Sequence, residues 1–92
     1  MKTLHVNVRG RVQGVFYRDY SKRQADLLNI RGWIRNMPDG SVEAVISGND
    51  SDVDQMIEWF QMGSPLSHVT SVHAEEVFYT EDLNNFEIRY YR

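Results

Sequence analysis

The sequence predicts an α+β fold in which one mostly antiparallel sheet of four or five strands carries two helices on one face. Three observations support this prediction. Segments with the period of a strand and segments with the period of a helix follow in the order β-α-β-β-α-β, with a further strand near the end. A tight turn joins the two central strands, and 92 residues suffice for one hydrophobic core. We therefore expect a single domain over residues 1–92.

The first part of the chain predicts a strand, a loop and a helix. Apolar and polar residues alternate over residues 3–9, as in a half-buried strand, and the two glycines within residues 10–15 indicate a loop. Residues 17–28 carry an apolar stripe at helical spacing. Asn29 tolerates the left-handed conformation in which many helices end, so we expect the helix to stop there and Ile30 to pack back on its last turn.

Residues 32–36 and 42–47 predict the two strands of a hairpin. The tripeptide Pro38-Asp39-Gly40 between them suits a tight turn, because Pro presets φ and Gly accepts a positive φ. The order of elements is that of a split βαβ unit of the ferredoxin-like type. In that topology the third strand lies between the first two, which run parallel. The loop after the first strand and the C-terminal end of the second strand then open onto the same edge.

A second helix and two strands are expected after the hairpin. Residues 49–52 (Asn-Asp-Ser-Asp) offer capping side chains and negative charge where a helix N-terminus has unpaired N–H groups. That helix should run to about Met62, before a Gly-Ser-Pro sequence that breaks it. Alternation then predicts a longer strand over residues 69–79 and a last strand over residues 86–90.

Composition disfavours several classes of function. Ten basic and thirteen acidic residues leave no positive excess, so we expect no nucleic-acid partner, and an RNA-binding module is the weakest of the alternatives. Trp33, Trp59 and Phe60 are accordingly expected in the core rather than on a surface that stacks bases. The absence of cysteine removes disulfides, thiolate metal sites and cysteine nucleophiles. No apolar run approaches eighteen residues, so we expect no membrane segment, no signal peptide and a cytoplasmic location.

A metal site is not expected either. His5, His68 and His73 have no histidine, cysteine or aspartate partner at the spacing of metal ligands. Residues 50–54 imitate the start of a calcium loop, but the required glycine and the bidentate glutamate are missing. We therefore expect no metal site.

The loop before the first helix is the candidate binding site. Gly10 and Gly14 allow the backbone to direct several N–H groups at an anion, which the dipole of the following helix also attracts. A plain structural turn explains two spaced glycines equally well, and the lysine of a nucleotide-binding P-loop is missing. Arg18 favours the anion site, because a guanidinium at the first turn of the helix can bind a phosphoryl group through two hydrogen bonds.

Two long motifs resemble the signatures of the acylphosphatase family. The first is Gly10-Arg11-Val12-Gln13-Gly14-Val15-Phe16-Tyr17-Arg18. The second runs over residues 32–48 and contains Asn36, and shorter similarities lie at residues 63–67 and 85–89. The resemblance extends over nearly the whole chain, in the right order and spacing.

This resemblance implies an enzyme that hydrolyses acyl phosphates to a carboxylate and inorganic phosphate, without metal or cofactor. It assigns the phosphoryl group to the amides of residues 10–18 and to Arg18, the attacking water to Asn36, and a hydroxyl that braces the loop to Ser21. Small acyl phosphates are the expected substrates, inorganic phosphate the product and inhibitor, and a monomer the expected state. The alternative is a module that binds phosphate or acyl phosphate without catalysis.

The chemistry of the substrate agrees with these roles. A carboxylate is a weakly basic leaving group, so the reaction needs no general acid and depends on positioning and charge stabilisation. Because the Asn36 amide is neutral, it orients the water, and we expect a phosphoryl oxygen to take the proton. Tyr17 stands where the family usually carries Phe and is expected to add a hydroxyl near the site, whereas Phe16 occupies a variable position.

Overall fold

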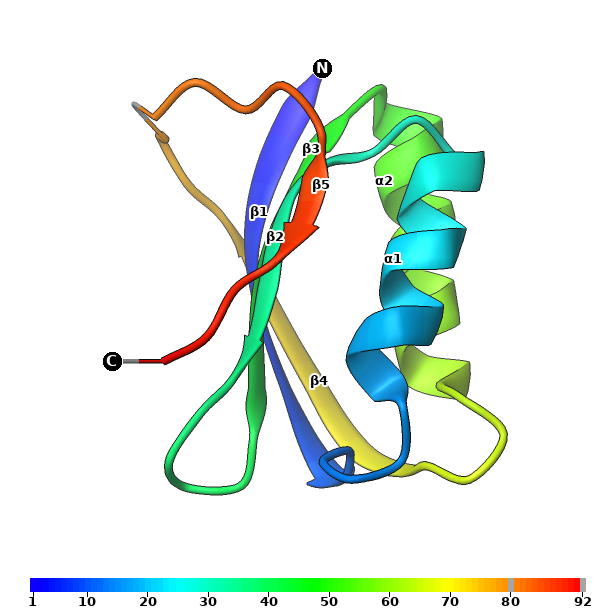
Figure 1. The fold of residues 1–92 in the computed structure, drawn as a ribbon. Coiled ribbons are helices and arrows are strands. Elements are labelled where there is room, and N and C mark those ends of the chain that lie inside the picture. The colour runs from blue at the N-terminus through cyan, green and yellow to red at the C-terminus, as the bar shows by residue number, and fades with distance from the viewer. Residues whose placement is uncertain (80, 92) are drawn as a thin grey trace.

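The computed structural model describes residues 1–79 and 81–91. Its elements are β1 (Lys2–Arg11), α1 (Tyr17–Leu27), β2 (Arg31–Asn36), β3 (Val42–Gly48), α2 (Asp50–Met62), β4 (His68–Glu76) and β5 (Phe86–Ile88). The strands form one sheet in the order β4-β1-β3-β2-β5, and both helices cover the same face of it (Figure 1). The predicted α+β fold of the ferredoxin-like type is confirmed.

Strand β3 lies at the centre of the sheet and fixes the directions of its neighbours. It pairs antiparallel with both β1 and β2, so β1 and β2 run parallel, and β5 adds a parallel strand beside β2. The end of β1, the end of β2 and the start of α1 consequently lie at the same end of the molecule, the lower end in Figure 1. This is the edge at which the sequence predicted a site.

The core is a single apolar layer between the sheet and the two helices. Because strand side chains alternate between the faces, every second residue of β1, β2 and β3 meets the apolar stripes of α1 and α2. The buried cluster consists of Val6, Val8, Val12, Val15, Tyr17, Ala25, Ile30, Ile34, Val42, Ala44, Ile46, Val53, Met56, Phe60 and Phe86. The same alternation puts Asn36, two positions beyond Ile34, on the helix-covered face at the last position of β2.

Helix α1 ends as the sequence predicts. Asn29 has a φ of 56°, and its N–H donates to the Asp26 carbonyl oxygen at 3.3 Å. The N–H of Ile30 donates to the Ala25 carbonyl oxygen at 2.8 Å, and its side chain is buried. These two bonds form a Schellman motif, which satisfies carbonyl groups that the end of the helix leaves unpaired.

The loop before α1 begins later than predicted. Strand β1 continues to Arg11, because Gly10 and Arg11 pair with Val69 and His68 of β4 after a β-bulge. Gly10 has a φ of 124°, and a Cβ there would collide with the carbonyl oxygen of His68. The glycine is therefore required by the close approach of the two strands, and the loop proper starts at residue 12.

Strand β4 is shorter than the predicted segment of residues 69–79. It ends at Glu76, and the N–H of Val77 makes one more bond, to the Thr3 carbonyl oxygen at 3.0 Å. Beyond that point the partner strand β1 has almost reached its first residue. The alternating pattern continues past the point where a partner exists, so it overestimates the length of the strand.

Strand β5 likewise ends before the predicted residue Tyr90. The N–H of Arg89 still donates to the carbonyl oxygen of Ile34 at 2.8 Å, but the chain then leaves β2. The ring of Tyr90 instead lies against the guanidinium of Arg18, whose central carbon is 5.3 Å from the ring centroid. This contact brings the C-terminal segment to the candidate site.

The predicted side-chain cap of α2 is wrong. Asn49 is the N-cap residue, yet its side chain makes no capping hydrogen bond, and its backbone carbonyl accepts the first helical N–H from Val53 at 2.9 Å. Asp50 and Asp52 do lie in the first turn, where their charges face the positive end of the helix dipole. The prediction of negative charge at the start of this helix is confirmed, whereas the predicted side-chain hydrogen bond from the cap residue is wrong.

The three aromatic residues expected in the core divide between the two faces of the sheet. Phe60 is fully buried in the core, and Trp59 packs against it. Trp33 is also buried, but on the face away from the helices, where the guanidinium carbons of Arg35 and Arg89 lie 5.1 and 5.3 Å from its ring. Side chains at the odd positions of β2 point to that face. The prediction that Trp33 lies in the core between sheet and helices is therefore wrong.

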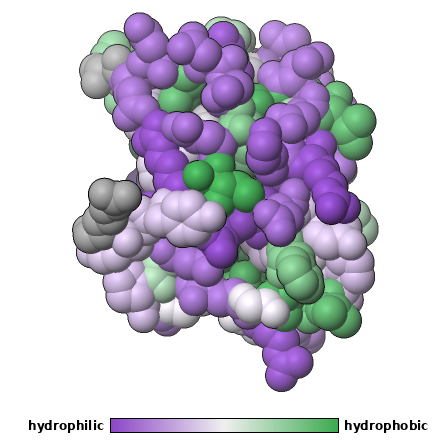
Figure 2. Space-filling view, viewed as in Figure 1, coloured by the Kyte–Doolittle hydropathy of each residue, from purple (hydrophilic) through white to green (hydrophobic). Residues whose placement is uncertain are grey.

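The visible surface is mainly polar. Figure 2 shows hydrophilic residues over most of this face, with hydrophobic residues in small separate groups. Among the described residues, neither helix is long and apolar enough to cross a membrane.

Candidate functional site

Residues 12–16 form a tight loop between β1 and α1. Val12 and Val15 are buried in the core and anchor it, whereas Gly14 and Phe16 are exposed and have φ values of 74° and 60°. Two left-handed residues separated by one are typical of loops that direct successive N–H groups toward one point. This backbone is unusual for an aromatic residue, so Phe16 carries strain of about 1–3 kcal/mol, as residues at binding sites often do.

The N–H groups of this loop are available to a ligand. Among the described residues, no acceptor is bonded to the N–H groups of residues 14–19, and the first helical bond runs from Tyr20 to the Phe16 carbonyl oxygen at 3.1 Å. The unpaired groups at the start of a helix carry partial positive charge. Loop and helix together therefore offer a row of donors to a negatively charged group.

Gln13 ties this loop to the turn after β2. Its Nε2 donates to the carbonyl oxygens of Met37 and Ser41, each at 2.8 Å. The N–H of Met37 closes the same turn by donating to Ser41 at 2.8 Å. The amide of Gln13 is thus engaged with the hairpin, and its structural effect is to hold the loop beside the end of β2.

Contrary to what the resemblance led us to expect, Ser21 does not brace the loop. The Ser21 hydroxyl is buried and donates to the carbonyl oxygen of Tyr17 at 2.7 Å, a bond within α1. The hydroxyl that braces the loop belongs to Ser64, which donates to the Val15 carbonyl oxygen at 2.9 Å. Ser64 lies in the segment of residues 63–67, which the sequence analysis singled out without assigning a role to any residue in it.

The hydroxyl of Tyr17 does not lie near the site, contrary to the prediction. It donates to the carbonyl oxygen of Phe60 at 2.8 Å in the core, and its ring lies 5.6 Å from Trp59 and 6.1 Å from Phe60 between centroids. Burial raises the pKa of Tyr17 well above its usual range. Tyr17 is the first residue of the apolar stripe of α1, so its side chain points at α2 while its backbone borders the loop.

Replacing Tyr17 by Phe is therefore expected to lower stability and leave ligand binding intact. The Phe60 carbonyl loses its side-chain donor in a buried place, which should cost about 1–2 kcal/mol in the free energy of unfolding. Urea denaturation measures that loss, and the matched control is Tyr20→Phe, at a half-buried position of the same helix where the ring contacts Arg23. A folded Tyr17→Phe protein with weakened affinity for inorganic phosphate would contradict this placement.

A cavity of about 270 Å³ opens between the loop and the end of β2. It is lined by Val12, Gly14, Phe16, Tyr17, Arg18, Asp19 and Asn36. Five residues of the predicted stretch 10–18 thus lie on one cavity with Asn36, which the chain separates from Arg18 by a helix and a strand. Gly10, Arg11, Gln13 and Val15 of that stretch do not line it.

Arg18 supplies a positive charge to this cavity without a carboxylate partner. Its guanidinium lies over the ring of Tyr90, and among the described residues it forms no ion pair. By contrast, the guanidinium of Arg35 lies 2.7 Å from a Glu43 oxygen, and that of Arg9 lies 3.2 Å from Asp39. The charge of Arg18 is held in place by an aromatic ring, which leaves its N–H groups for an anionic ligand.

Asn36 presents an unpaired amide. Its Oδ1 atom is buried and has no hydrogen-bond partner among the described residues. A buried acceptor left without a donor costs about 1–3 kcal/mol, and such groups in native proteins generally bond to a water or a ligand. Rotation of the amide by half a turn exchanges its oxygen and nitrogen, so Asn36 can offer an acceptor or a donor to the cavity.

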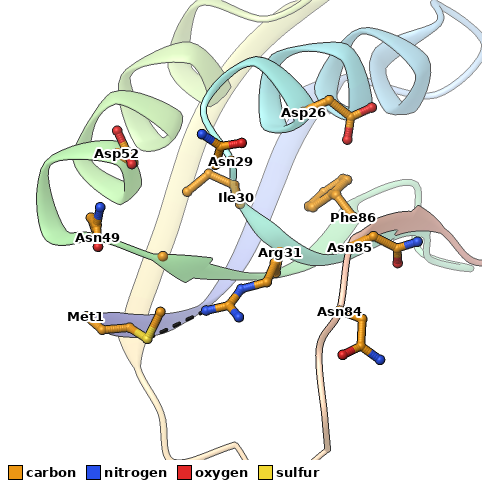
Figure 3. Close-up of a pocket in the computed structure, with 11 residues that line it drawn as sticks. Met1, Asp26, Asn29, Ile30, Arg31, Asn49, Asp52, Asn84, Asn85 and Phe86 are labelled. Atoms are coloured by element: carbon orange, nitrogen blue, oxygen red, sulfur yellow. Dashed lines mark hydrogen bonds between the residues drawn. The ribbon is translucent and has the colours of Figure 1, made fainter.

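A larger cavity of about 480 Å³ lies at the opposite end of the helices (Figure 3). Its walls carry two carboxylates, Asp26 and Asp52, and the guanidinium of Arg31 reaches to the sulfur of Met1 at 3.6 Å. The larger cavity has two carboxylates against one guanidinium, whereas the smaller one has a single carboxylate, Asp19, against the Arg18 guanidinium and also borders the loop N–H groups. Charge and donors, rather than size, select the smaller cavity as the candidate site for an anion.

The three histidines lie on the neighbouring strands β1 and β4. His5 shares a 2.8 Å hydrogen bond with Glu43, His68 begins β4, and His73 stands opposite Asn7 in the pairing of β1 with β4. Within residues 1–79 and 81–91, no group of three or more acidic or histidine side chains could hold a metal ion.

The chain is similar to a family of known proteins, and this similarity agrees with the geometry of the site. The family model described as Acylphosphatase matches residues 4–88. An acylphosphatase of Thiobacillus denitrificans is 51% identical over 76 residues, which cover 83% of this chain and 85% of that protein. One of Methylococcus capsulatus is 43% identical over 88 residues, 96% of each chain. The crystal structure of acylphosphatase from Bacillus subtilis superposes with a TM-score of 0.93 at 34% identity, covering 98% of this chain and 100% of that one.

Proposed function

Because the chain belongs to the acylphosphatase family, whose members hydrolyse acyl phosphates, we propose how its residues divide that reaction between them. The amides of residues 12–18 and the Arg18 guanidinium bind the phosphoryl group, and Asn36 positions the attacking water. This division is supported above all by the one cavity that Arg18, Gly14 and Asn36 share, in which the Asn36 Oδ1 lacks a partner. Gly10 and Arg11 are left out because they belong to β1.

The loop binds the phosphoryl oxygens through groups that need no rearrangement. The unpaired N–H groups of residues 14–18, at the start of α1, favour negative charge, and Arg18 can pair with two oxygens at once. Such donors, fixed before the substrate arrives, stabilise the charge that spreads over the phosphoryl oxygens in the transition state. The buried anchors Val12 and Val15, the Gln13 bonds to the hairpin and the Ser64 bond keep this loop in place.

Asn36 directs the water at phosphorus. Its amide oxygen accepts a hydrogen bond from the water, whose oxygen then forms a bond to phosphorus as the bond between phosphorus and the acyl oxygen breaks. The carboxylate leaves with the electron pair of that bond. One proton of the water passes to a phosphoryl oxygen, so the products are a carboxylate and inorganic phosphate. A neutral amide suffices for this role because it orients the water and takes no proton.

The weakly basic carboxylate leaves without a general acid, so we propose a reaction independent of metals and cofactors. We also propose that one domain acts as a monomer in the cytoplasm, on small acyl phosphates, with no nucleic-acid partner. A phosphate-binding module without catalysis has no observation in its favour, since both Arg18 and Asn36 line the cavity.

Release of inorganic phosphate from acetyl phosphate, measured with EDTA present, tests this proposal. We expect turnover to survive chelation, and inorganic phosphate to inhibit competitively because it occupies the loop. Phosphate at about 100 times its Kd should also stabilise the native state by about 2.7 kcal/mol, which raises Tm, whereas chloride at equal ionic strength should not. Turnover that stops with EDTA and returns with Mg²⁺ would contradict metal independence, and phosphate that neither inhibits nor stabilises would remove the loop assignment.

A further inference from the structure

The carbonyl oxygen of Val15 is bound by a side chain from outside the loop. The buried hydroxyl of Ser64, in the connection between α2 and β4, donates to it at 2.9 Å. The peptide between Val15 and Phe16 is trans, so its N–H points away from its C=O. Val15 and Ser64 do not line the phosphoryl cavity, whereas Phe16 does. The bond from Ser64 therefore turns the Phe16 N–H toward the cavity.

The backbone of Phe16 favours the opposite orientation of this peptide. Its φ of 60° lies in the left-handed region, which an aromatic residue rarely adopts. Rotation of the peptide by half a turn would bring that φ to a negative value and would place the Val15 carbonyl oxygen where the N–H now lies. Among the described residues, the bond from Ser64 is the only hydrogen bond to either group of this peptide, so it opposes the rotation.

Ser64 is itself fixed in a tight turn. Its carbonyl oxygen accepts hydrogen bonds from the N–H and the hydroxyl of Ser67, at 3.0 and 2.7 Å. A Cβ at Gly63 would collide with the Ser67 hydroxyl and would lie 3.3 Å from Cε2 of Tyr17. The turn consequently packs against the first residue of α1, and the Ser64 hydroxyl is in position before any ligand arrives.

We propose that Ser64 is a positioning residue for phosphoryl binding, because its hydroxyl holds the peptide between Val15 and Phe16 in the orientation that presents the Phe16 N–H to the phosphoryl group. This inference rests on the proposed function, since it takes the phosphoryl group to lie on the loop. Without the bond, relief of the strain at Phe16 favours the rotated peptide. The cavity then loses a donor and gains a carbonyl oxygen, which repels an anion.

Replacing Ser64 by Ala tests this role. We expect the variant to bind inorganic phosphate about tenfold more weakly in calorimetric titration, as loss of one hydrogen bond to a charged group implies. Its kcat/KM for acetyl phosphate should fall by at least the same factor, because the transition state needs the same donor. Ser67→Ala is the matched control, since it removes a bond from hydroxyl to carbonyl within the same turn and none to the loop. Its phosphate affinity should equal that of the wild type.

Two double variants separate positioning from a general loss of stability. Glycine adopts a positive φ without strain, so Phe16→Gly removes the reason for the peptide to rotate. Phosphate should bind Ser64→Ala/Phe16→Gly within about threefold of its affinity for Phe16→Gly alone. Phe16→Ala removes the same ring but keeps the strain, so there Ser64→Ala should still weaken binding about tenfold. An equal loss in both backgrounds would overturn the positioning role.

NMR on the isotope-labelled wild type tests the same point without any variant. Titration with inorganic phosphate should shift the Phe16 N–H resonance downfield, because a hydrogen bond to an anion deshields the proton. A Phe16 resonance that stays in place while those of neighbouring loop residues move would overturn the inference.

The outcomes distinguish this inference from the function on which it rests. If phosphate binds Ser64→Ala as tightly as it binds the wild type, the positioning role is wrong and the proposed function stands. If the folded wild type neither binds phosphate nor hydrolyses acetyl phosphate, both proposals are overturned.

Discussion

Replacing Arg18 by Ala is expected to lower kcat/KM for acetyl phosphate by about 10³-fold or more and to weaken binding of inorganic phosphate in the same variant. Both losses have one cause. Arg18 is the one cation among the described residues that line the cavity, and in the proposed mechanism it contacts the phosphoryl oxygens both in the bound state and in the transition state. Enzyme kinetics measure the first loss and calorimetric titration with phosphate measures the second.

The structure supplies a matched control for that variant. Arg23 lies on the same helix, is exposed and stacks on Tyr20 just as Arg18 stacks on Tyr90, but it does not line the cavity. Arg23→Ala should keep both activity and phosphate affinity. Circular dichroism should show both variants folded, because neither side chain belongs to the buried core. Phosphate affinity that is unchanged in Arg18→Ala would exclude this arginine as the phosphoryl ligand.

Replacing Asn36 by Ala is expected to reduce kcat on the order of 10²-fold while phosphate still binds, since the loss concerns the position of the water alone. The variant keeps the loop amides and Arg18, so the site for the phosphoryl group persists. The substitution also removes a buried oxygen that has no partner, so stability should stay the same or rise slightly. Kinetics, phosphate titration and thermal unfolding on one preparation separate these three effects.

Asn84→Ala provides the comparison for Asn36. Asn84 is exposed and borders the cavity at the far end of the molecule, shown in Figure 3. Its truncation should alter none of the three quantities. An Asn36→Ala protein that is folded and fully active would rule out the water-positioning role, and one that no longer binds phosphate would make Asn36 a phosphoryl ligand instead.

The sequence by itself determined the order of elements and the family, and it singled out the two residues to which we assign the reaction, Arg18 and Asn36. Alternation and helical spacing record which face of each element is buried, and the turn and cap residues at Pro38, Gly40 and Asn29 mark where elements end. These signals depend only on residues close together in the chain, so a single sequence shows them without an alignment of relatives. The predicted topology in turn brought Arg18 and Asn36 to one edge of the sheet, and they line one cavity.

Only the tertiary structure decided which partner each side chain finds. Gly10 serves the approach of β4, the Tyr17 hydroxyl bonds to α2, and Ser64 rather than Ser21 braces the loop. Each of these contacts joins residues more than forty positions apart, and periodicity carries no information about such distances. The C-terminal tyrosines show the same limit, because alternation assigns Tyr90 to a strand whereas the charge of Arg18, far away in the chain, attracts its ring to the site.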